Sequence, residues 1–122
     1  MRRIALIVVF GLATTGWPPA SGASEPASVI LERAERARSA DPAEFRQLLG
    51  ELNRLGAKAT PLQRDQIAYL NAYALSFEGD LDGGIRSAQK LISTTRDTDL
   101  KFRAGALIVN NYALNEIGRA HV

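Results

Sequence analysis

A five-residue pattern occurs twice in the C-terminal half of this 122-residue chain. Asn71–Leu75 reads Asn-Ala-Tyr-Ala-Leu, and Asn110–Leu114, which starts 39 positions later, reads Asn-Asn-Tyr-Ala-Leu. A glycine follows each copy at the same distance, as Gly79 and as Gly118. A repeat of this length is typical of stacked helical hairpins, because a single hairpin cannot bury its apolar face alone. The pattern therefore predicts an all-α fold, and the chain stops where the second copy would still be turning back.

The first 23 residues have the three-part pattern of a secretory signal peptide. Arg2 and Arg3 supply positive charge, Ile4–Gly16 is mostly apolar, and Ser21–Ala23 offers the small residues that a signal peptidase requires. At about 1.5 Å per residue the apolar run spans about 20 Å, less than the roughly 30 Å of a bilayer's hydrocarbon core. We therefore expect cleavage after Ala23, export to the periplasm or the outside, and no lasting membrane span. An uncleaved membrane anchor is the alternative.

Cleavage changes the charge of the chain. The full sequence has 15 basic and 13 acidic residues, and Arg2 and Arg3 leave with the signal peptide, so residues 24–122 carry 13 of each. A neutral domain lacks the basic surface that nucleic acid or anionic lipid requires, so we expect no nucleic-acid partner. The chain has no cysteine, which excludes disulfides and a lipoprotein anchor.

Residues 24–122 are expected to form one domain of about five helices. Apolar periodicity and capping residues place these helices at about 27–39, 42–55, 61–78, 81–93 and 99–117. Asp41, Thr60 and Asp80 each precede a helix as a cap, and Gly56 and Gly79 stand at helix ends. The third helix is apolar on two faces, as expected of an inner helix. Since long alternation of period two is absent from the sequence, we expect no strand.

One segment carries a family resemblance. Glu78–Ile85 reads Glu-Gly-Asp-Leu-Asp-Gly-Gly-Ile and is followed by Ala88, Lys90 and Leu91. It resembles the turn and second helix of a tetratricopeptide (TPR) repeat, where the glycine makes the turn and a small residue lets two helix backbones approach. In this alignment Ala72 falls on the small position of the family's first helix. The resemblance implies a short TPR-like solenoid of stacked antiparallel hairpins.

The chain departs from the family pattern in places. Asn71 and Ala68 stand where the family has leucine and a large aromatic residue, and the period is 39 rather than about 34. We interpret residues 24–122 as a divergent TPR-like domain that is truncated at its C-terminal end. A plain helical bundle is the alternative.

Three tyrosines are the candidate partner-binding face. In the register of the TPR family, Tyr69, Tyr73 and Tyr112 lie on the inner, concave side of the stack, where the family binds extended peptides. The resemblance therefore implies a protein or peptide partner at these rings. The lysine and asparagine that clamp a peptide carboxylate in some TPR domains are absent at Tyr69 and Tyr73. The alternative is that the tyrosines fill space between helices.

Other chemical sites are not expected. The only histidine is His121, so a Ser-His-Asp triad and histidine-rich metal sites cannot be built. Asp80 and Asp82 resemble the start of a calcium loop, but Leu91 stands where that loop requires glutamate. We therefore predict no catalytic residue, no cofactor and no metal.

A second resemblance concerns function. Pro26–Leu114 follows a signal peptide directly and is rich in alanine, leucine and arginine. It is similar to the exported N-terminal sensor segment of bacterial membrane proteins of the GGDEF family, in which a membrane helix and a diguanylate cyclase domain follow. The cyclase loop is absent, since Gly83-Gly84 precedes Ile85-Arg86. The resemblance implies a signalling module without the cyclase.

We therefore expect a non-enzymatic, exported protein-interaction or sensory module. The alternatives are a small envelope enzyme that uses carboxylates only, or a gene fragment without independent function. A stack without a closing helix leaves the apolar face of its last helix partly unprotected, here Leu107, Val109 and Leu114. We expect self-association or marginal stability from this face.

Overall fold

The computed structural model describes residues 26–120, so the expected signal peptide, residues 1–23, lies outside the described residues. Within this range the regular structure is entirely helical, and no helix in it is long and apolar enough to cross a membrane. The expectation of five α-helices is confirmed for this range. The elements are α2 (Ala27–Ala40), α3 (Pro42–Leu55), the short 3-10 helix η1 (Gly56–Lys58), α4 (Pro61–Phe77), α5 (Leu81–Thr94) and α6 (Thr98–Ala120).

Four of these helices begin at a side chain that caps them. Asp41, Asp80 and Asp97 each accept a hydrogen bond from the backbone N–H three residues on, at 2.9–3.1 Å. Thr60 and Gln63 form a reciprocal capping box at the start of α4. Such caps satisfy N–H groups that have no partner within the helix. The caps at Asp41, Thr60 and Asp80 were expected. Asp97 was not, and the helix that it caps begins at Thr98, one residue earlier than predicted.

The two glycines expected at helix ends behave differently. Gly79 has a φ of 100°, a left-handed conformation that favours glycine, and it makes the turn between α4 and α5. Gly56 keeps a helical φ of −48° and opens η1, so the chain tightens after α3 instead of turning at once.

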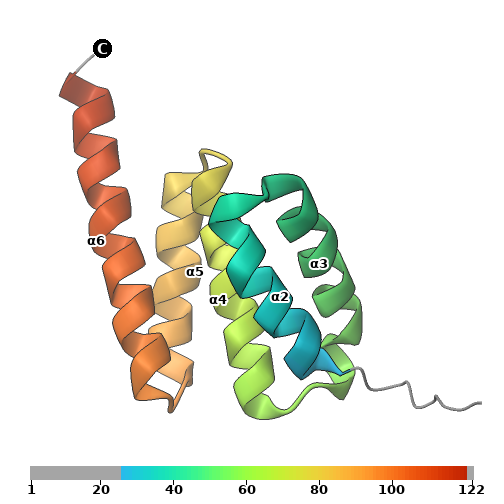
Figure 1. The fold of residues 1–122 in the computed structure, drawn as a ribbon. Helices are drawn as coiled ribbons and strands as arrows, with labels where there is room; N and C mark the ends of the chain where they lie inside the picture. Colours follow the sequence, from blue (N-terminus) through green and yellow to red (C-terminus); the bar gives the residue numbers. More distant parts are fainter. Residues whose placement is uncertain (1–25, 121–122) are drawn as a thin grey trace, which may run out of the picture.

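The helices pack as neighbours in a row. α2 pairs with α3, and α4 pairs with α5; α4 also contacts both helices of the first hairpin, and α6 contacts α5 and α4. Figure 1 shows α6 at one side of the molecule and the α2–α3 hairpin at the other. The last turns of α6 extend past the N-terminal end of α5 in this view (Figure 1). One hydrophobic core joins all five helices, with small buried side chains that allow close approach: Ala34, Ala72, Ala88 and Ala104.

The exposed face of α6 differs from the one expected. Leu107 is buried in the core, so the prediction that it is unprotected is wrong. Val109 and Leu114 are exposed as predicted, and Phe102 is more exposed still, at 76%. Buried Leu107 and exposed Val109 are two residues apart, and two residues turn a side chain by about 200° around a helix.

Candidate functional site

The three tyrosines of the predicted partner face occupy different environments. Tyr69 on α4 is buried, with 6% of its surface exposed, and the guanidinium carbon of Arg103 lies 4.3 Å from its ring centre. Tyr73, one turn later, is half-buried. Tyr112 on α6 is 54% exposed. Tyr69 and Tyr73 therefore belong to one packed surface, whereas Tyr112 stands apart and offers its ring to solvent.

Tyr73 is the centre of an aromatic cluster. The edge of Phe45 from α3 meets its ring at a centroid distance of 5.8 Å, and Phe77 stacks on it at 6.2 Å. The guanidinium of Arg38 lies 4.9 Å from the ring centre, and the Tyr73 hydroxyl donates to the Arg38 carbonyl at 3.4 Å. This cluster joins α2, α3 and α4, and Phe77 at its edge is more than half exposed.

Glu35 pairs with the two arginines that lie over the rings of Tyr69 and Tyr73. Glu35 Oε1 on α2 accepts from Arg103 Nη2 on α6 at 2.8 Å and from Arg38 Nε at 3.2 Å. Burial lowers the pKa of Arg103, but its hydrogen bond to Glu35, the charge of Glu35 and the nearby Tyr69 together raise that pKa above its usual value. Arg103 therefore stays cationic and holds α6 to α2 across α4.

A groove lies between α4 and α6. Its volume is about 180 Å³. We call it the α4–α6 groove, and its lining residues are Tyr73, Ser76, Phe77, Leu107, Asn110, Asn111 and Leu114. Phe77 and Leu114 are exposed apolar side chains, and Asn110 exposes its amide. All seven residues are uncharged, so the groove combines apolar surface with neutral hydrogen-bonding groups.

Asn111 fixes the spacing of this groove. It is fully buried, and its Nδ2 donates to Ser76 Oγ at 2.6 Å and to the Leu81 carbonyl at 3.2 Å. Among the described residues, its Oδ1 has no hydrogen-bond partner. A buried acceptor without a partner costs about 1–3 kcal/mol. Gly84 of α5 lies against the same amide, since a Cβ there would come within 2.8 Å of Asn111 Nδ2.

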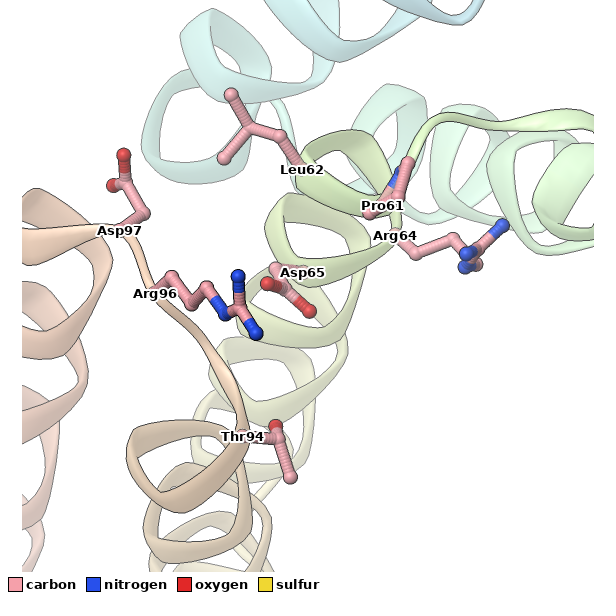
Figure 2. Close-up of a pocket in the computed structure, with 7 residues that line it drawn as sticks. All are labelled: Pro61, Leu62, Arg64, Asp65, Thr94, Arg96 and Asp97. Atoms are coloured by element: carbon pink, nitrogen blue, oxygen red, sulfur yellow. The ribbon is translucent and has the colours of Figure 1, made fainter.

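Another hollow lies at the start of α4, away from the α4–α6 groove. It has a volume of about 450 Å³ and is lined by Pro61, Leu62, Arg64, Asp65, Thr94, Arg96 and Asp97. Figure 2 shows Arg96 extending toward Asp65, while Arg64 points away to the other side. Arg64 Nη1 donates to the Ala59 carbonyl at 2.8 Å, and Asp97 caps α6. The hollow is lined by two basic and two acidic side chains, and Arg64 and Asp97 each stabilise the backbone through a hydrogen bond. We therefore assign this hollow a structural role.

The described carboxylates form no metal site. Within residues 26–120 no group of three or more acidic or histidine side chains is placed to hold a metal ion. Asp41, Asp80 and Asp97 cap helices, and Glu35 pairs with two arginines. Comparisons with protein families, with curated proteins and with solved structures give no match to this chain.

Sequence reasoning did not single out Phe77 and Asn111 as site residues. A signal was present for both. Phe77 follows Tyr73 by four residues, the spacing that places two aromatic rings on one side of a helix. Asn111 takes the place of Ala72 in the second copy of the five-residue pattern, and Ala72 is fully buried. A polar residue in place of a buried alanine indicates a specific hydrogen-bonding role.

Proposed function

We propose that this protein is a non-catalytic, exported interaction or sensory module that holds an extended peptide segment of a protein partner in the α4–α6 groove. The observation that carries the proposal is the exposed aromatic and aliphatic surface of Phe77 and Leu114, which stands beside the exposed amide of Asn110. An apolar recess with a few polar groups is the usual form of a binding site.

The chemistry of the groove indicates the kind of peptide. Phe77 and Leu114 favour an apolar side chain of the partner, because burying apolar area is worth about 25 cal/mol per Å². Asn110 has both a donor and an acceptor, which match the N–H and C=O groups of an extended backbone. A charged side chain gains no partner among the seven uncharged lining residues. We therefore expect a neutral, apolar sequence in the bound segment.

We interpret the helix arrangement as a short TPR-like solenoid. In support, α4 packs on both helices of the first hairpin, and α6 adds to α4 and α5 on the next side. The contact between Glu35 and Arg103 spans α2, α4 and α6, which would be the inner helices of such a stack. The chain then corresponds to the exported sensor segment of GGDEF-family proteins, and its role is to receive a signal through protein contact.

The proposal is tested by selecting random displayed peptides on the full chain and measuring the enriched peptides by fluorescence polarisation. We expect a Phe77→Ala, Leu114→Ala double variant to bind them at least about tenfold more weakly, which corresponds to about 1.4 kcal/mol. Leu62→Ala is the matched control, because Leu62 is equally exposed on α4 but lies outside the groove. Its affinity should match that of the wild type.

Two results would contradict the proposal. One is that no peptide is enriched above a protein-free support. The other is that enriched peptides bind the double variant as tightly as the wild type. Tyr69 is left unchanged in this test, because truncating a buried aromatic side chain destabilises a fold by about 3–5 kcal/mol and would lower binding indirectly.

A further inference from the structure

The side of α6 that faces away from the core carries an uncovered apolar stripe. We call it the outer stripe, and it consists of Phe102, Ala106, Val109 and Ala113. All four residues are exposed, Phe102 to 76% and Val109 to 69%. The buried residues of α6 follow the same spacing two positions earlier: Leu100, Ala104, Leu107 and Asn111. Since two positions turn a side chain by about 200°, the outer stripe lies opposite the buried face.

The packing of α4 shows which elements cover the two sides of an inner helix in this fold. Asn71 and Ala74 lie on the side of α4 toward α3, since Asn71 exchanges hydrogen bonds with Asn53 and Ala74 shares a small hollow with α3. The opposite side of α4 is covered by α5, where Gly84 lies against the Ala72 carbonyl. An inner helix of this row therefore has one face on the preceding hairpin and one face on the helix that follows.

The same two faces occur in α6 when the numbering is advanced by 37. Ala74 then corresponds to Asn111, which bonds α5, the preceding helix. Ala72, on the side covered by α5, corresponds to Val109 at the centre of the outer stripe. The corresponding surface of α4 is thus covered by the antiparallel helix α5, whereas the outer stripe of α6 is exposed. Its alternation of large and small side chains suits helix packing.

The charges beside the stripe fit a second copy of the same helix. Lys101 and Glu116 are exposed on the same flank, near the two ends of α6 and almost equally far from Val109. When two identical helices pack face to face and antiparallel, each flank meets the same flank of the other copy. Lys101 of each copy then lies beside Glu116 of the other. Glu116 also pairs with Arg119 at 2.7 Å, and a carboxylate accepts more than one cation.

We propose that two copies of this chain associate through α6, with their outer stripes packed antiparallel about a two-fold axis near Val109. Two-fold pairing is the commonest form of homo-oligomer and uses the same patch twice. One helix from each copy gives a small interface, so we expect dissociation constants in the micromolar range. The outer stripe shares no residue with the α4–α6 groove, so dimerisation and peptide binding succeed or fail separately.

The first test is the oligomeric state of the full chain by sedimentation velocity over a concentration series. We expect a monomer–dimer equilibrium in the wild type and a monomer for Val109→Asp, because a buried unpaired carboxylate opposes the contact. Lys90→Asp is the control, since Lys90 is exposed on α5 away from the stripe. The proposal would be overturned if the wild type stayed monomeric at protein concentrations about tenfold above the expected micromolar dissociation constant. It would also be overturned if the Val109→Asp variant dimerised like the wild type.

The second test uses the absence of cysteine in the chain. Val109→Cys introduces one thiol close to the proposed two-fold axis, and mild oxidation should convert most of the protein to a disulfide-linked dimer. Lys90→Cys should give only the slow cross-linking of random collisions. Equal cross-linking of the two variants would count against the outer stripe as the contact.

A charge exchange tests the orientation. Lys101→Glu and Glu116→Lys should each weaken the dimer severalfold, because each places like charges together twice. The double variant should recover the affinity of the wild type, since the pairs are restored with opposite sign. A double variant weaker than both single variants would overturn the antiparallel arrangement, because in a parallel pair Lys101 and Glu116 do not meet.

Discussion

At the scale of single residues, Gly84 and Asn111 set how closely three helices approach. A Cβ at Gly84 would lie 2.8 Å from Asn111 Nδ2 and 3.2 Å from the Ala72 carbonyl, and would also press on Ser76 Oγ. The first two atoms belong to a hydrogen-bonded amide and to the backbone, so they have little freedom to move. Glycine is required here by the close approach of α4 and α6 to α5, although it is a poor helix former.

We predict that Gly84→Ala destabilises the protein by about 1–2 kcal/mol. Alanine gains up to about 1 kcal/mol in helix propensity, but the crowding of Asn111 and Ala72 costs about 1–3 kcal/mol. The matched control is Gly50→Ala in α3, where the nearest neighbour of a new Cβ is Arg54 Nη1 at 3.8 Å. That variant should be more stable than the wild type by about 0.5–1 kcal/mol. Urea unfolding followed by circular dichroism measures both, and equal stabilities would contradict the tight crossing.

At the scale of the helices, a mixed ionic and aromatic contact holds α6 to the rest of the row. Arg103 donates to Glu35 on α2 while its guanidinium covers the buried ring of Tyr69 on α4. Three helices that are not neighbours in sequence thus meet at one side chain. The partial burial of Arg103 and Glu35 limits screening by water, so this pair should be worth more than an exposed one.

A double-mutant cycle tests this contact. We expect Glu35→Gln and Arg103→Met to couple by about 0.5–1 kcal/mol in the free energy of unfolding. The control pair is Glu32 and Arg36, which lie 3.3 Å apart on α2 but are both about two-thirds exposed. Their coupling should stay below about 0.5 kcal/mol. Indistinguishable coupling energies for the two pairs would show that Arg103 does not act as a link between helices.

The sequence predicted the helices better than their rotation about their own axes. Caps and prolines located the starts of α3, α4 and α5, because those signals act within one turn of the chain. The grouping of the tyrosines came from the register of the TPR family, in which the 39-residue repeat equates Tyr73 with Tyr112. An advance of 37 instead equates Ala74, which faces the preceding hairpin, with Asn111, which bonds the preceding helix, and the difference of two residues turns Tyr112 away by about 200°. Such a rotation is decided by contacts between helices, such as those of Asn111.

At the scale of the whole molecule, the two proposed surfaces lie on different sides of α6. The α4–α6 groove uses Leu107 and Leu114, and the outer stripe uses Phe102 and Val109. A dimer formed through the outer stripe would therefore leave both grooves open. Two grooves on one dimer raise the apparent affinity for a partner that presents two copies of a peptide, because the second contact forms at a high effective concentration.

The whole molecule also includes the expected signal peptide, residues 1–23. We predict that a bacterial host exports the full chain and cleaves it after Ala23, because the apolar run, the small residues and the positive start match what a signal peptidase reads. N-terminal sequencing of the periplasmic protein should therefore begin at Ser24. The only tryptophan is Trp17, so the processed protein should show no tryptophan fluorescence. Replacing the small residue at the cut, as in Ala23→Phe, should retain Trp17 in the product, whereas Ser24→Ala should be processed normally. A wild-type protein purified with Trp17 still attached would contradict the cleavage and favour a membrane anchor instead.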